Sequence, residues 1–120
     1  MPKKVLGKSG AKQAPPEPDR NFAPVAKAFA RNRLVSLEKG WGAGNVVLKT
    51  NAKIFAMTVK ENLVVKLPAA RVAALADQRA GRLFDPRGDG RLMKEWLVVV
   101  PGKADWVALA KEAYQFISKA

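Results

Sequence analysis

The chain has 120 residues, of which 48% are hydrophobic and 27% are charged, and its net charge is +12 at pH 7. It contains neither cysteine nor histidine, which excludes disulfides, thiolate or imidazole catalysis and an ordinary zinc site. No uninterrupted apolar stretch approaches the roughly 20 residues that a membrane span needs, so we expect one soluble, cytoplasmic, globular domain.

The first 20 residues are predicted to form a flexible basic arm. They combine lysines with glycines and the APPEP stretch at 14–18, a composition that buries too little apolar surface to fold. The arm has no apolar segment of secretory length, so it does not resemble a signal peptide. Residues 1–60 carry 12 basic and 3 acidic side chains, whereas residues 61–120 carry 10 and 7. This excess of positive charge favours either solubility or an encounter with a polyanion.

Residues 21–120 are predicted to form the folded domain, which begins with an amphipathic helix. Phe22, Val25 and Phe29 recur at helical spacing, and Asn21 and Pro24 are helix start signals. A short strand is expected over 34–37.

The glycine-rich segment GWGAGN at 40–45 follows that strand. Its spacing matches neither G-x-G-x-x-G nor a P-loop, and no helical pattern follows, so we predict a turn or bulge rather than a phosphate cradle. Trp41 within it is a candidate exposed anchor for a partner, and the alternative is that it covers the edge of the sheet.

From Val46 the apolar pattern changes to a period of two. The ranges 46–49, 52–59 and 63–67 are short and rich in β-branched residues, with turn chemistry at 50–51 and 60–62. We therefore predict an antiparallel meander. In its middle strand, Phe55, Met57 and Val59 are expected to face the core, and Ile54, Ala56 and Thr58 the opposite side.

Two further helices are predicted. The first starts at Pro68, has an apolar side at Val72, Leu75 and Ala76, and stops at Gly81. The second follows 101–102, with Asp105 in its first turn. Its apolar stripe consists of Trp106, Leu109, Ala110, Ala113, Phe116 and Ile117.

The segment FDPRGDGRLMKEWLVVV at 84–100 places a charged turn before a strand. The residues at 85–88 match a type I turn, because Asp, Pro and Gly occupy its preferred positions. Both faces of the strand over 92–100 are mainly apolar, so we expect it inside the sheet. Lys94 and Glu95 then point to opposite faces, which disfavours a cooperating acid and base.

Residues 22–119 resemble the TfoX N-terminal domain family, which is related in fold to the MmcQ/YjbR-like proteins. The resemblance rests on KIFAMTVKENLVVKLPAARVAAL at 53–75, FDPRGDGRLMKEWLVV at 84–99 and the closing helix. Gly40-Trp41-Gly42 stands where such proteins usually carry Met-Phe-Gly. The resemblance implies an α+β domain with an antiparallel sheet flanked by helices. The pattern of the residues predicts a single domain of this class, with about five strands and three helices. The resemblance also implies a regulatory rather than enzymatic role, in competence and transcriptional regulation. The family supplies no catalytic residues to place on this sequence.

Three functions follow as hypotheses. The first is a non-enzymatic regulatory domain that contacts DNA phosphates through a basic surface made by Lys49, Lys53, Lys60, Arg87, Arg91 and Lys94. The alternative is a protein-interaction module for an acidic partner, with Trp41 as anchor. The third, an enzyme using Lys94 with Asp85 or Asp89, is disfavoured because nothing visibly tunes these groups. We predict no cofactor and no metal.

Overall fold

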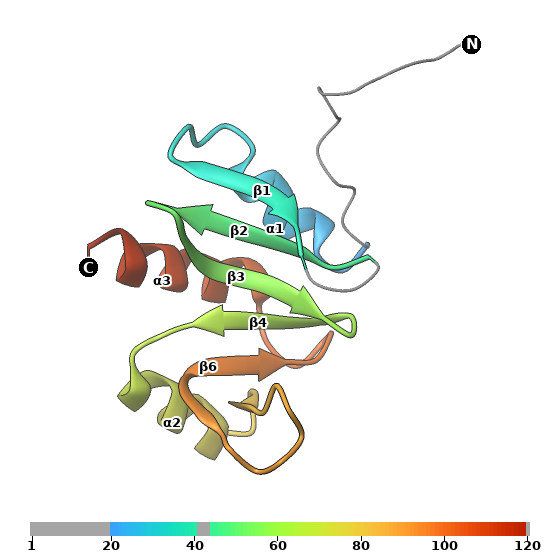
Figure 1. Cartoon of the computed structure of the whole chain (residues 1–120), viewed down its shortest axis with the longest axis vertical. Helices are drawn as coiled ribbons and strands as arrows, with labels where there is room; N and C mark the ends of the chain where they lie inside the picture. The colour runs from blue at the N-terminus through green and yellow to red at the C-terminus, as the bar shows by residue number, and fades with distance from the viewer. Residues whose placement is uncertain (1–19, 41–43, 120) are drawn as a thin grey trace.

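Antiparallel strands form one sheet in the order β1-β2-β3-β4-β6-β5, shown face-on in Figure 1. The computed structural model describes residues 20–40 and 44–119. In these ranges the strands are β1 (Val35–Lys39), β2 (Val46–Thr50), β3 (Lys53–Val59), β4 (Asn62–Lys66), β5 (Arg82–Phe84) and β6 (Met93–Val99). The helices are α1 (Ala23–Phe29), α2 (Ala69–Asp77) and α3 (Trp106–Ser118). The predicted α+β class is confirmed.

The described ranges hold six strands rather than about five. The additional strand, β5, has three residues, which is too short for a period-two pattern to stand out in the sequence. It is a strand because it pairs with β6, where Arg82 lies opposite Val98 and Leu83 opposite Leu97. The other five strands begin and end within two residues of the predicted ranges.

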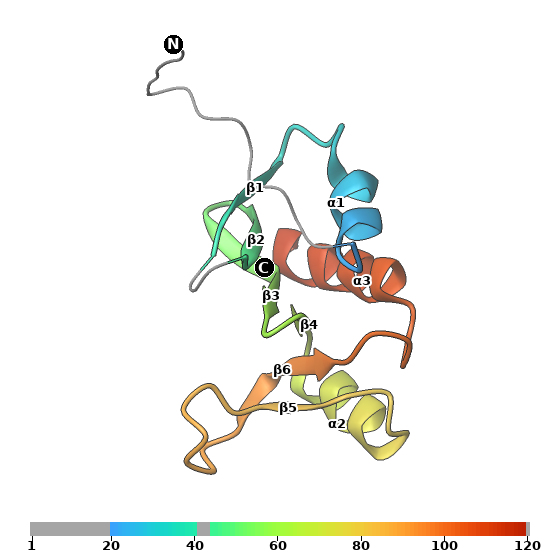
Figure 2. The same cartoon turned by 90° about the vertical axis from the view of Figure 1, so that its right-hand side faces the viewer.

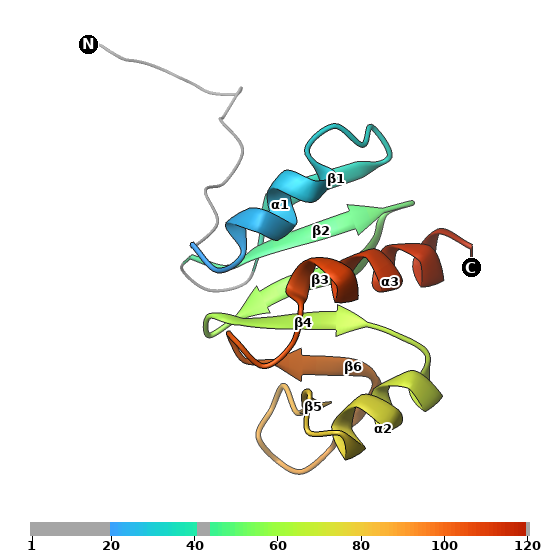
Figure 3. The same cartoon turned by 180° about the vertical axis from the view of Figure 1, so that it is seen from behind.

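The three helices lie on one side of the sheet, as the edge-on view in Figure 2 and the rear view in Figure 3 show. α3 packs on β2, β3 and β4, α2 packs on β5 and β6, and α1 packs on α3. Within the described ranges no helix covers the other side, which faces the viewer in Figure 1. We call that side the open face.

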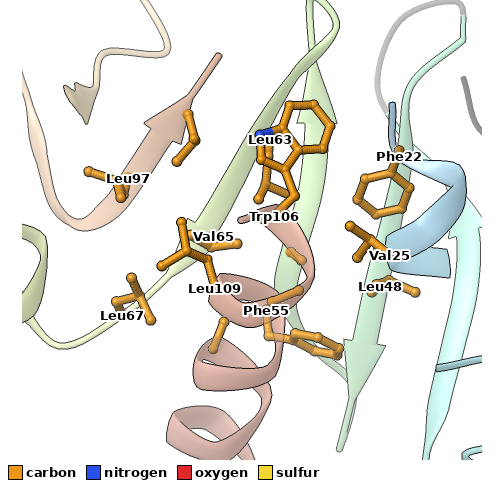
Figure 4. Packing of buried hydrophobic residues seen from close by; sticks show 14 of the residues in the cluster. Phe22, Val25, Leu48, Phe55, Leu63, Val65, Leu67, Leu97, Trp106 and Leu109 are labelled. Carbon is orange, nitrogen blue, oxygen red and sulfur yellow. The ribbon is translucent and has the colours of Figure 1, made fainter. Parts of the chain in front are cut away.

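The main core lies between the sheet and the helices (Figure 4). It contains the rings of Phe29 and Phe55, and the half-buried ring of Tyr114 packs against both, with centroids 5.3 to 5.6 Å apart in edge-on or tilted arrangements. The apolar residues predicted for α1 and α3 are buried here, except that Phe116 is only half-buried. Helical periodicity therefore located these two core-facing stripes correctly.

The predicted alternation along β3 is wrong because the strand contains a β-bulge. Leu48 pairs with Ala56 and Lys49 with Ile54, so Phe55 has no partner on β2. A bulge places two successive side chains on one side of a strand. Phe55 and Ala56 both join the helix-side core, whereas Met57, Val59 and Ile54 lie on the open face.

The end of α2 also differs from the prediction. The helix stops at Asp77, four residues before Gly81, and Arg79 takes the left-handed conformation with φ +61°. The N–H of Ala80 donates to the carbonyl of Leu75 at 2.9 Å, and the N–H of Arg79 donates to that of Ala76 at 3.0 Å. This is a Schellman ending made without glycine. Asp105 is likewise the N-cap of α3 rather than a first-turn residue, because its carboxylate accepts the N–H of Ala108 at 3.2 Å.

Candidate binding surface on the open face of the sheet

One row of paired residues crosses the open face through all six strands. It runs from Glu38 on β1 to Arg82 on β5. Between these two charged ends lie four apolar residues in successive cross-strand pairs, Val47, Met57, Val64 and Val98. Directly opposed side chains on one face are in contact, so the row forms a continuous apolar strip with an acid at one end and a base at the other.

The strip is shielded from water although no described helix lies over it. Its four apolar side chains are 5% exposed or less. Half-buried side chains from the surrounding strands border it, namely Ile54, Val59, Phe84 and Trp96. Large neighbours on a sheet surface can exclude water from a central side chain in this way, so the open face carries a second, smaller apolar cluster.

The loop between β5 and β6, residues 85–92, is held together by its own carboxylates. The N–H groups of Gly88 and Gly90 donate to the two carboxylate oxygens of Asp85, each at 2.9 Å. The N–H of Gly88 also reaches the carbonyl of Asp85 at 3.3 Å, which confirms the predicted turn at 85–88. Asp89 accepts the N–H of Arg91 at 3.0 Å. The acidic groups of the loop are therefore engaged with its backbone.

A pocket of about 560 Å³ lies at the β5 edge of the sheet, between the turn joining β3 to β4, β5, the base of the 85–92 loop and the end of α2 at Ala76. Its apolar lining includes Val64 and Val98 from the strip. Lys60 and Arg82 contribute the cations. The sequence did not indicate Arg82 as a candidate, because the three-residue strand β5 shows no strand pattern. Only its pairing with Val98 places Arg82 on the open face.

The six predicted cations do not gather at one place. Lys53 begins β3 and Lys60 follows its end, so their backbones lie roughly 23 Å apart at the rise of an extended strand. Arg87 and Arg91 lie on the 85–92 loop, and Lys94 lies in β6. Other exposed cations, such as Lys27 on α1, lie on the helix side. The net charge is thus distributed over both sides of the sheet.

Lys49 is the predicted candidate that already has a partner. Its ammonium lies 3.1 Å from Glu38, which also accepts a hydrogen bond from the hydroxyl of Ser36 at 2.8 Å. The Ser36 hydrogen bond and then the Lys49 ammonium lower the pKa of Glu38 from its ordinary value. Lys49 is therefore less available to an external anion than the loop cations.

Lys66 is a second engaged cation, which the sequence reasoning did not select. Its ammonium lies 3.5 Å from Glu95 and 5.2 Å from the centre of the Trp96 ring. The ion pair and the cation–π contact hold Lys66 over the apolar cluster of the open face.

Several sequence hypotheses concern residues beyond the described ranges. Trp41 and the arm residues 1–19 lie outside them. In the described ranges, no group of three or more acidic residues is placed to hold a metal ion. Nor does any described helix have the length and apolarity needed to cross a membrane.

No family model, curated protein or solved structure matched the chain in comparisons with known proteins. The resemblance to the TfoX N-terminal domain family therefore stays a prediction.

Proposed function

We propose that this chain is a small non-enzymatic binding domain that contacts DNA phosphates, in transcriptional regulation, chiefly through its 85–92 loop. The observation that carries the proposal is the loop's own hydrogen bonding. Asp85 and Asp89 are occupied by backbone N–H groups, whereas Arg87 and Arg91 are exposed and form no ion pair among the described residues.

An ordered loop suits phosphate contact for two reasons. Its conformation is already fixed by internal hydrogen bonds, so less conformational entropy is lost on binding. Guanidinium groups also match the geometry of phosphate oxygens through paired hydrogen bonds. Exposed Lys94, two residues after the loop, adds a further cation. We expect such contacts to be independent of base sequence, because phosphate contacts position a protein without reading bases.

The test is binding of the full chain to a mixed-sequence DNA duplex, followed by fluorescence anisotropy across a salt series. A triple variant, Arg87→Gln, Arg91→Gln and Lys94→Gln, should bind about tenfold more weakly, and its log–log salt slope should be shallower by about 0.9 for each phosphate that it no longer neutralises. The matched control is Lys27→Gln, Arg31→Gln and Lys111→Gln, which removes the same charge from exposed positions of the helix side.

Equal reductions in affinity in the two triple variants would mean that net charge alone attracts DNA. The loop cations would then contribute no more to binding than the helix-side cations do. Absence of salt-sensitive binding by the unmodified chain would end the proposal altogether. The control variant should remain within about threefold of the unmodified chain, since only long-range attraction is reduced.

A second candidate is the interaction module for an acidic partner. It is favoured by Leu92 and Met93, which are 53% and 40% exposed and are flanked by Arg91 and Lys94. Exposed apolar groups beside cations suit an acidic, partly apolar protein surface. The double variant Leu92→Ser and Met93→Ser separates the candidates: DNA binding through phosphate should persist within about twofold, whereas a large reduction in DNA affinity would show that these apolar groups take part.

A further inference from the structure

The pocket beside β5 has a volume and a lining that the proposed contact between the 85–92 loop and phosphate does not explain. Its volume of about 560 Å³ falls within the usual range for small-molecule sites. It is lined by side chains from four strands that the sheet register brings together, although they are far apart in sequence. The pairs Val59–Asn62, Val64–Val98 and Val98–Arg82 place these residues on one side of the sheet.

The floor of the pocket is apolar. Val64 is fully buried and Val98 is 5% exposed, and both belong to the strip across the open face. Val59 and Phe84 are half-buried beside them. Leu92, which is 53% exposed, forms part of the wall at the base of the loop. An apolar ligand body placed here would remove Leu92 and Phe84 from water, which is favourable in proportion to the area covered.

The polar groups of the pocket favour a negative charge on the ligand. Lys60 and Arg82 are exposed, and neither forms an ion pair in the part of the chain that the structure describes. Arg82 lies two strands from β4 and is level with Val64, whereas Lys60 lies in the turn just before Asn62. Strand spacing and rise place their backbones roughly 15 Å apart, which two long side chains can span when both reach one anion between them. Asn62 adds an amide.

The carboxylate of Asp85 also lines the pocket, but it forms no ion pair with Lys60 or Arg82 in the described ranges. Both oxygens of Asp85 accept backbone N–H groups of its own loop, at 2.9 Å each. The turn that carries Lys60 is also constrained, because Lys60 and Glu61 have φ of +51° and +69°. Two central residues with positive φ are typical of the tight turns that match the twist of a hairpin. The backbone of Lys60 is therefore held at the rim.

We propose that this pocket binds a small amphiphilic carboxylate, with its apolar body over Val64, Val98 and Phe84 and its carboxylate between Lys60 and Arg82. A planar guanidinium can donate two parallel hydrogen bonds to a carboxylate. A sugar phosphate would set hydroxyl groups against the apolar floor without hydrogen-bond partners, which is unfavourable. The proposal does not depend on DNA binding.

The experiment is a proton–nitrogen NMR titration of the full chain with naphthoate, and in parallel with neutral naphthylmethanol. Naphthoate should produce saturable shifts in the amides of Val64, Phe84 and Val98, with a dissociation constant of about 1 mM or tighter. The double variant Lys60→Gln and Arg82→Gln should bind naphthoate about tenfold more weakly, because the two cations that would donate to its carboxylate are removed. The control, Lys27→Gln with Lys111→Gln, removes the same charge from α1 and α3 and should stay within about twofold of the unmodified chain.

The two probes separate the roles of charge and apolar contact. Leu92→Ser should weaken both probes, whereas the Lys60 and Arg82 variant should leave naphthylmethanol unchanged. The same spectra report whether each variant is folded. The proposal is overturned by absence of saturable shifts, by shifts that map outside the pocket, or by equal naphthoate affinity in the two charge variants.

Discussion

At the scale of single residues, Arg79 occupies a position that suits glycine better. Its φ of +61° lies in the left-handed region, which costs an L side chain roughly 1 kcal/mol or more. We expect Arg79→Gly to raise the free energy of unfolding by about 0.5 kcal/mol, because part of the gain is offset by the greater freedom of glycine in the unfolded chain. Urea denaturation measures the change.

The control for this substitution is Arg79→Ala, which removes the long side chain but keeps the Cβ that causes the strain. Its stability should stay close to that of the unmodified chain. If alanine stabilised the protein as much as glycine does, the guanidinium rather than the backbone would be responsible, and the strain argument would be wrong.

At the scale of secondary-structure elements, Gly81 allows the connection from α2 to β5 to run directly against β6. A Cβ added at Gly81 would lie 2.6 Å from the carbonyl oxygen of Val98 and 2.8 Å from Cγ of Leu97. Neither atom can move freely, because both belong to a paired, buried strand. We expect Gly81→Ala to lower the free energy of unfolding by about 1–3 kcal/mol, as overpacking does.

A matched substitution separates crowding from the general cost of replacing glycine. Gly102→Ala also adds a methyl group, but nothing lies within 4 Å of its Cβ, and only its positive φ of +86° opposes it. Its expected cost is about 1 kcal/mol. Chemical denaturation of both variants compares them, and a Gly81→Ala protein as stable as the unmodified chain would show that β5 and β6 separate easily.

At the scale of the whole molecule, one ion pair connects the two helices that cover different halves of the sheet. Arg71 on α2 donates to both carboxylate oxygens of Glu112 on α3, at 2.9 and 2.8 Å. These hydrogen bonds raise the pKa of Arg71. Because both side chains are about 40% exposed, we expect a coupling energy of only about 0.5–1 kcal/mol.

A double-mutant cycle with Arg71→Met and Glu112→Gln measures that coupling from the free energies of unfolding. The coupling should decrease with added salt, since exposed charges are screened. A salt-independent coupling would contradict an electrostatic origin and would point to packing of the arginine stem against α3.

Features that depend on residues close together in the chain could be predicted from the amino-acid sequence alone. The spacing of Phe22, Val25 and Phe29 identified the buried side of α1, and the same reasoning identified the buried side of α3. The turn at 85–88 followed from the order of Asp, Pro and Gly. Such features rest on local backbone preferences and on periodic apolar side chains, which a linear sequence displays directly.

Which distant residues share a surface could not be predicted and became visible in the folded chain. The bulge at Phe55 reversed the sides assigned along β3, and pairing with β6 alone made Arg82 part of a strand. The apolar strip from Val47 to Val98 and the pocket with Lys60 and Arg82 then follow from the sheet order. The physical reason is that strand register depends on contacts between segments far apart in the chain, and a shift of one residue moves a side chain to the opposite face.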